Sequence, residues 1–229
     1  YMTEERKESV NFCDPYVVAD VILVIYDESG DSGFFASLAN SFEKTFIREN
    51  RWKLIVEGVA VTLLISFCSV LGGSVLGFGL YMLSRSANRT VSKTTKAFGR
   101  VYSRLIAGTP ALVILMLLFY VVFGKSDIGG TPVAIFGFAL IFGSFVYGHL
   151  ALTVEGVDQG QIEAAYALGY SRNRTFFRIS LPQAMETFLP TYTGEVVGLI
   201  KATSVVGYIA VMDLTKMGDI VRSRTYEAF

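Results

Sequence analysis

The sequence has few of the residues and motifs that build metal centres, disulfide frameworks or catalytic sites. Its two cysteines, Cys13 and Cys68, lie far apart in different kinds of sequence, so they predict neither a disulfide framework nor a metal site. Twenty basic and 20 acidic residues balance to a net charge of zero, which removes the general attraction of a basic protein to nucleic acid. No P-loop, HExxH motif, nucleophile elbow or pair of catalytic aspartates occurs. The sequence therefore predicts no catalytic site, no metal site and no nucleic-acid partner.

Long uncharged stretches are present instead. Hydrophobic residues make up 52% of the 229 residues, and the charged residues are gathered into blocks between apolar runs, which is the pattern of a membrane protein. Between Glu57 and Arg85 there is no charged residue. At about 1.5 Å per residue, a helix of this length crosses a hydrocarbon core of about 30 Å. Gly73 and Gly77 form a GxxxG pair inside this run, and we expect them to pack against another helix of the same chain rather than to form a dimer.

Three further spans are predicted, at 105–123, 131–154 and 191–212. The last is the weakest, because Glu195 and Lys201 interrupt it. A cation near the middle of a bilayer costs about 2.5–3.5 kcal/mol on insertion scales. Lys201 is therefore expected to face the interior of a helix bundle or a water-filled path rather than lipid.

The distribution of positive charge gives an orientation. The segment between the first two spans has no acidic residue and carries Arg85, Arg89, Lys93, Lys96, Arg100 and Arg104. The positive-inside rule puts such a segment in the cytoplasm. The N-terminus then lies outside, and the polar stretch 155–190, which follows the third span, lies inside.

This inner stretch contains signals for three short helices. Asp158 is placed to cap the first, with Gln161 at the third helical position as a variant of the capping box. Gly169 can end that helix in a left-handed conformation, and Ser171 can cap the second. Pro182 suits the start of the third, where a missing N–H is no loss. A compact set of helices between two spans is expected.

The same stretch resembles the EAA loop of binding-protein-dependent ABC importer permeases. The match rests on the spacing of Glu163, Ala164, Ala165, Gly169, Ile179, Ser180, Leu181 and Pro182. In that family the loop forms a cytoplasmic coupling helix, which docks in a groove of the ATP-binding subunit. Small alanines suit close helix approach, the glutamate offers one anchored charge, and the glycine permits a sharp reversal. An amphipathic interfacial hairpin would account for the arginines and aromatics here, but not for this spacing.

Two other patterns resemble the polar-amino-acid branch of these permeases. They are Gly108-Thr109-Pro110, at the start of the second predicted span, and Lys201-Ala202-Thr203-Ser204, in the fourth. The resemblance implies that the substrate path includes Gly108, Thr109, Pro110, Lys201, Thr203 and Ser204.

The resemblance also implies a fold and an assembly. The fold is an all-α, polytopic membrane helix bundle of the type I ABC importer permease, with about four transmembrane helices in this chain and a fifth after Phe229. The partners are ABC ATPase subunits, which carry ATP and Mg, a second permease subunit of the same or a related sequence, and an amino-acid-binding receptor. The chain itself would hold no cofactor, and it would lie in the lipid bilayer of a bacterial inner membrane.

Two departures from the family pattern leave a second interpretation open. Ala107 stands where the family usually has arginine, and residues 148–152 stand where it usually has an acid and an arginine. The loss of charges of both signs is either a compensated change or the mark of a membrane scaffold that docks an ATPase but transports nothing. A channel or secondary transporter would call for inverted repeats, which the sequence does not show.

The N-terminal residues form a different kind of sequence. Residues 1–26 resemble part of a family 3 amino-acid-binding protein through Thr3, Glu5, Arg6, Phe12, Pro15 and Tyr16. So short a segment cannot bury enough surface to fold alone, so we expect a remnant that binds no ligand but hints at a fused receptor. Residues 27–57 are expected to be a linker and an amphipathic helix from Phe34 onward, and residues 58–229 a transmembrane domain with its coupling loop at 155–190.

Overall fold

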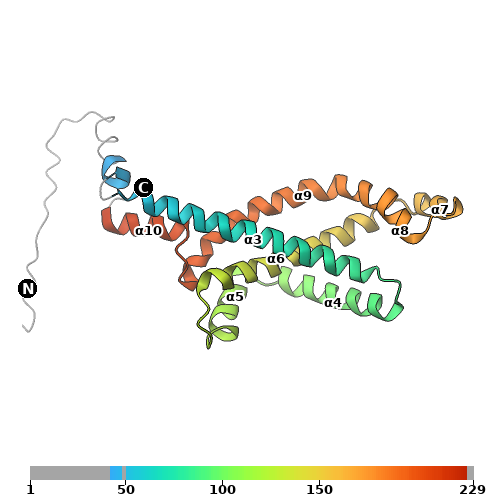
Figure 1. Ribbon diagram of the computed structural model, residues 1–229, viewed down its shortest axis with the longest axis horizontal. Coiled ribbons are helices and arrows are strands. Elements are labelled where there is room, and N and C mark those ends of the chain that lie inside the picture. Colours follow the sequence, from blue (N-terminus) through green and yellow to red (C-terminus); the bar gives the residue numbers. More distant parts are fainter. Residues whose placement is uncertain (1–41, 48–49, 226–229) are drawn as a thin grey trace, which may run out of the picture. The chain divides into compact units, whose positions relative to one another are not determined.

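The computed structural model describes residues 42–47 and 50–225 (Figure 1). The predicted receptor remnant and most of the predicted linker lie outside these residues. In the described part every regular element is a helix, so the predicted all-helical fold is confirmed. The π-helical turns are η1 (Glu43–Ile47), η3 (Leu117–Val122) and η4 (Phe176–Ser180), and η5 (Thr203–Ile209) is a 3-10 helix. The α-helices are α3 (Trp52–Ser84), α4 (Arg89–Ala107), α5 (Ala111–Met116), α6 (Gly130–Glu155), α7 (Gln159–Ala167), α8 (Arg172–Thr175), α9 (Leu181–Ala202) and α10 (Leu214–Thr225).

The described helices contain two to four candidate membrane spans. By length and composition, α3 and α6 can each cross a bilayer, and they match the first and third predicted spans. Two bent pairs also qualify if each counts as one span: α4 with α5–η3, and the helical run 172–209 with α10.

The long helices α3 and α6 share the most extensive contact of the fold and lie side by side in Figure 1. Glycine makes this approach possible. A Cβ atom on Gly73 would lie 2.8 Å from the carbonyl oxygen of Ala139, and one on Gly77 would lie 2.7 Å from Cβ of Val146. Ser69 adds a hydrogen bond by donating to the carbonyl of Ile135 at 3.1 Å. The GxxxG pair thus packs within the chain, as predicted.

Helix α4 lies against both α3 and α6. Its start is capped by Asn88, whose side chain accepts a hydrogen bond from the backbone N–H of Thr90 at 3.1 Å. Gly99 is its one buried residue, and it faces the ring of Tyr147 on α6 so closely that no Cβ would fit. Helix α4 is amphipathic, because its basic residues recur every three or four positions and so lie on one side of the helix.

The second predicted span, at 105–123, is bent and covers the end of α4, α5 and η3. The chain bends by 106° between α4 and α5–η3. Proline explains the position of the bend: Pro110 has no N–H to donate and disfavours the helical conformation at Thr109. Pro110 has a ψ of 137° and serves as the N-cap of α5.

The inner helical segment is more continuous than predicted. The predicted first helix is α7, but the second and third merge, because α8, η4 and α9 follow one another without a loop. Pro182 is the second residue of α9, so its missing N–H falls where the π-helical turns of η4 give way to the α-helix. The helix that carries the fourth predicted span therefore begins before residue 191, and Pro190 lies inside it.

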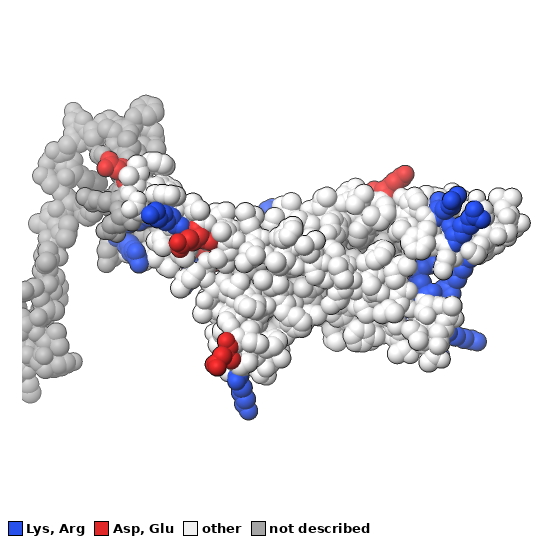
Figure 2. Space-filling view, viewed as in Figure 1, with Lys and Arg blue, Asp and Glu red and all other residues white. Residues whose placement is uncertain are grey.

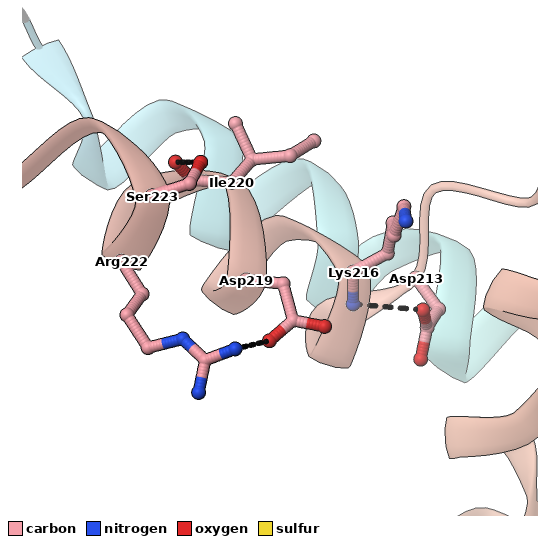
Figure 3. A network of polar contacts seen from close by, with 6 residues as sticks. All are labelled: Asp213, Lys216, Asp219, Ile220, Arg222 and Ser223. Carbon is pink, nitrogen blue, oxygen red and sulfur yellow. Dashed lines mark hydrogen bonds and ion pairs between the residues drawn. The ribbon is translucent and has the colours of Figure 1, made fainter. Parts of the chain in front are cut away.

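Helix α10 is anchored to the start of α3 (Figure 3). Ala210, with φ of 60°, ends η5 in the left-handed region. The buried carboxylate of Asp213 then accepts the backbone N–H groups of Thr215 and Lys216 at 3.2 and 3.0 Å. The N–H of Leu214 donates to the Thr62 hydroxyl of α3 at 3.2 Å. On the exposed side, Arg222 pairs with Asp219 at 3.1 Å.

The expected amphipathic helix from Phe34 to residue 57 is interrupted in its described part. The short turn η1 ends at Ile47, and α3 begins at Trp52. Between them Asn50 has φ of 55°, in the left-handed region that asparagine tolerates better than most residues. The prediction of one helix across this stretch is therefore wrong.

Candidate coupling site and transport path

Helix α7 has a defined cap at each end. The Asp158 side chain accepts a hydrogen bond from the N–H of Gly160 at 2.8 Å. At the other end Gly169 has φ of 80°, its N–H reaches the carbonyl of Tyr166 at 2.9 Å, and the N–H of Tyr170 reaches that of Ala165 at 3.0 Å. These two bonds form a Schellman motif, which satisfies carbonyls that a helix end otherwise leaves unpaired. Both predicted caps are confirmed.

The predicted capping box is not formed, because Asp158 caps the second helical residue, Gly160, rather than the third. Gln161 does not turn back toward Asp158; its Oε1 accepts a hydrogen bond from Nε2 of Gln183 at 2.6 Å. This bond ties α7 to the start of α9. Sequence analysis did not single out Gln183, because a contact across 22 residues leaves no local pattern.

The EAA-like residues divide between a buried and an exposed side of this segment. Ala165 is only 2% exposed, whereas Glu163 and Ala164 are exposed. The residues that follow are at the junction of η4 and α9, where Ile179 and Leu181 are half-buried and Pro182 is exposed. The small side chain of Ala165 thus allows α7 to approach the rest of the chain and leaves Glu163 accessible.

Three large apolar side chains are also exposed in the stretch 155–190. Leu168 is 79% exposed, Phe177 50% and Tyr166 48%. Exposed apolar residues that lie beyond the spans are a mark of a protein interface. Sequence analysis did not single out these three residues. For Leu168 a local signal was available, since it directly precedes the glycine that ends the helix.

A cavity of about 460 Å³ lies between α4, α6 and α9. It is lined by Thr109 from the bend and by His149 and Glu195, among others. The imidazole of His149 packs on Phe145, with ring centroids 4.4 Å apart. Gly108 and Pro110 flank Thr109 at the bend and are exposed.

The other predicted path residues lie elsewhere on α9 and η5. Lys201 and Ser204 are exposed on this chain, so Lys201 does not face the interior of the subunit, and it is not among the residues of the cavity. Thr203 is 1% exposed, and its hydroxyl donates to the carbonyl of Ile200 at 2.7 Å. The structure therefore brings Thr109 together with Glu195 but does not bring Lys201 to them.

Comparison with known families identifies the fold. The family described as the binding-protein-dependent transport system inner membrane component matches residues 76–222. The chain belongs to this family. The permease is accordingly a multi-pass protein of the inner membrane, and its family is a membrane transport component rather than an enzyme.

Similar proteins and a solved structure agree with this assignment. The permease is 32% identical, over 76% of its length and 79% of the relative's, to a permease protein of Rickettsia felis named GlnP for a glutamine transport system. It is 32% identical, over 75% of its length and 74% of the relative's, to the nopaline transport system permease protein NocM of Agrobacterium fabrum. A crystal structure of an amino acid ABC transporter with histidines superposes with a TM-score of 0.69 at 26% identity, covering 86% of the permease and 85% of that chain.

The two departures from the family pattern meet in one place. Ala107 and Gly148 both line the 460 Å³ cavity, although 41 positions separate them in the sequence. Ala107 and the start of the stretch 148–152 therefore border the same cavity.

Proposed function

We propose that α7 and the turn at Gly169 are the element through which this permease of an amino-acid ABC importer engages separate ATPase subunits. The observation that carries the proposal is the geometry of α7. The helix is capped at both ends, one side of it is buried through Ala165, and Glu163 stays exposed on it. A short, pre-ordered helix loses little conformational entropy on docking.

The chemistry of the exposed surface also supports docking. Leu168, Tyr166 and Phe177 offer apolar contact area close to the charge of Glu163. Interfaces of moderate size use such aromatic and aliphatic anchors with a few charges beside them. The Gln161–Gln183 bond then connects the docked helix to α9, the helix that leads into the fourth predicted span.

We further propose that substrate passes close to the bend at Gly108-Thr109-Pro110 and the polar end of α9. The carboxylate of Glu195 and the hydroxyl of Thr109 line a cavity there. Lys201 and Ser204, exposed on this chain, then face the water-filled path or a second permease subunit of the same or a related sequence. The amino acid reaches the permease from a receptor, either fused or separate, on the outer side, where we place the N-terminus.

A non-transporting scaffold is the second candidate function. The observation in its favour is that Ala107 and Gly148 leave their shared cavity without the expected charges. The two functions differ in one measurement: ATP-dependent uptake of a radiolabelled amino acid into proteoliposomes that contain the permease, its ATPase and its receptor. Uptake at the background rate, with the ATPase bound, would favour the scaffold.

The coupling proposal is tested by co-purification of the ATPase with the permease from detergent. We expect Glu163→Lys with Gly169→Pro to lose the ATPase, because one change reverses the exposed charge and the other removes a conformation that proline cannot adopt. Asp127→Lys is the matched charge reversal in the loop before α6, and it should retain the ATPase. If the double variant is folded and keeps the ATPase, α7 is not the coupling element.

A further inference from the structure

Basic side chains gather at the end of the molecule that carries α7 and α8, as the blue groups in Figure 2 show. This end also contains the connection from α3 to α4 and the end of α6. By the positive-inside rule it is the cytoplasmic end. Part of this charge surrounds a second cavity, which borders the 460 Å³ cavity at Gly148 and reaches α7 at Tyr166.

The cavity has a volume of about 800 Å³, which is within the range of small-molecule sites. It lies between the ends of α3 and α4, the end of α6, and α7 with α8–η4. Five cationic residues line it, against one acidic residue, Glu155: Arg85, Lys96, Arg100, Arg104 and Arg172. In the described part of the chain none of the five forms an ion pair.

Three of these cations repel one another along a single helix. Lys96, Arg100 and Arg104 follow one another at intervals of four residues, so they share one face of α4. Like charges at this spacing destabilise a helix by about 0.2–0.5 kcal/mol per pair. The sequence thus retains an unfavourable arrangement, which an anion in the cavity would make favourable.

A fourth cation is held in place by stacking. The guanidinium carbon of Arg85 lies 3.6 Å from the centre of the Phe176 ring, and that ring is 2% exposed. Stacking fixes the plane of the guanidinium, whose edge also contacts the Tyr81 hydroxyl. Its other N–H groups can bind a phosphate, which arginine contacts with two hydrogen bonds.

One part of the remaining wall is apolar, and the rest carries mainly hydroxyl and amide side chains. Gly148 and Ala151 leave room on the α6 side, beside Leu152 and Val154. A site for a free, fully hydrated anion would need no such wall. A molecule with a phosphate group and an apolar portion fits both halves of the cavity.

We propose that this cavity binds a phosphate-bearing anion, for which an anionic phospholipid headgroup of the cytoplasmic leaflet is the favoured source. The cations bind the phosphate, and the apolar wall faces the glycerol and the start of the acyl chains. Because α4, α6 and α7 all contribute to the wall, bound lipid fastens the coupling helix to the spans. Basic pockets between transmembrane helices on the cytoplasmic side commonly bind such headgroups.

The test measures binding to the purified permease–ATPase complex, with native mass spectrometry to count retained lipid and thermal unfolding to measure stabilisation. Short-chain phosphatidylglycerol, short-chain phosphatidylcholine and inorganic phosphate are compared at equal concentration. We expect phosphatidylglycerol to bind and stabilise, and phosphatidylcholine to have no comparable effect. Equal stabilisation by inorganic phosphate would support the same anion site with a soluble occupant. Equal binding of the two lipids would overturn the proposal.

Matched variants on α4 locate the site. Lys96→Gln with Arg100→Gln removes two charges from the wall, whereas Arg89→Gln with Lys93→Gln removes two from the same helix outside it. At about fivefold per cation, the first pair should weaken phosphatidylglycerol binding roughly 30-fold. The second should change it little. Equal loss of phosphatidylglycerol binding in both variant pairs would mean that the lipid is attracted by the overall charge of α4, which would overturn the proposal. Loss of the ATPase with unchanged lipid binding would also overturn it, because the cations would then belong to the ATPase interface.

Discussion

At the scale of single residues, the reversal after α7 depends on a backbone conformation that other residues avoid. Gly169 has φ of 80°. An L-residue in this region costs about 1–2 kcal/mol, since its Cβ atom approaches the following carbonyl. Nothing lies within 4 Å of the place where a Cβ atom would be, so the cost of a substitution there comes from the backbone alone.

Gly169→Ala should therefore loosen the end of α7 without a steric clash. We expect the amides of Gly169 and Tyr170, which close the Schellman motif, to exchange with solvent about 5- to 30-fold faster. Hydrogen exchange measured by mass spectrometry would detect the change. Gly194→Ala in α9 is the control, because a Cβ atom there also meets nothing and its φ is not positive. Unchanged exchange in Gly169→Ala would contradict the role given to this glycine.

Leu168 gives a second prediction at this scale. Since its side chain is 79% exposed, Leu168→Ser should leave the melting temperature of the isolated permease nearly unchanged. Loss of an apolar anchor should weaken ATPase binding by about 1–2 kcal/mol, or roughly 10-fold, in a pull-down titration. Val121→Ser, at 71% exposure in η3, is the matched control and should bind normally. Normal binding by Leu168→Ser would remove this residue from the interface.

At the scale of elements, the contact between α3 and α6 fixes the centre of the fold. Gly77→Val should damage it, because a new side chain would meet the Gly143 carbonyl and Val146. Overpacking of this kind costs about 1–3 kcal/mol. Gly79→Val is the control on the same helix, since nothing lies within 4 Å of a Cβ atom there. We expect Gly77→Val to lower the yield of monodisperse protein and its melting temperature, and Gly79→Val to change neither. Equal behaviour of the two variants would contradict this packing.

The sequence predicts a structural feature well when neighbouring residues determine that feature. The caps at Asp158 and Gly169 and the GxxxG packing were predictable, because each follows from a few neighbouring residues. The bend at Pro110 was marked by its proline, but its angle of 106° depends on where α4 and α5 pack.

Other features of the candidate site have no local signature. The Gln161–Gln183 bond and the cavity shared by Ala107 and Gly148 join residues far apart in the sequence. The exposure of Lys201 depends on which side of α9 the neighbouring helices cover. Such features follow from packing, so a pattern of residue types cannot reveal them.

At the scale of the whole molecule, large apolar side chains remain exposed along the spans. On α3, Val75 is 74% exposed and Phe67 66%. In a membrane protein such faces contact lipid tails or other helices rather than water. These faces of the permease are therefore available to lipid tails or to other helices.

The proposed orientation makes a prediction about accessibility. In a background with Cys13→Ser and Cys68→Ser, a cysteine in place of Lys125 should react with a membrane-impermeant maleimide added to intact spheroplasts. A cysteine in place of Ala87 should react only after the membrane is opened. Both residues are exposed, and they lie in the connections at opposite ends of the described spans. The reverse labelling pattern would put the N-terminus inside.

The uninterrupted helix from α8 through α9 has a mechanical consequence. Over Arg172–Ala202 no flexible loop separates the turn that follows α7 from the fourth predicted span. A flexible loop would absorb a small displacement of α8. A continuous helix, which at about 1.5 Å per residue is roughly 45 Å long here, would instead transmit that displacement to the far end of α9. Pro190, inside this helix, is the point at which such a stroke can change direction. A displacement of the α8 end would therefore reach the far end of α9 without loss in a loop, and Pro190 divides that path into two helical segments.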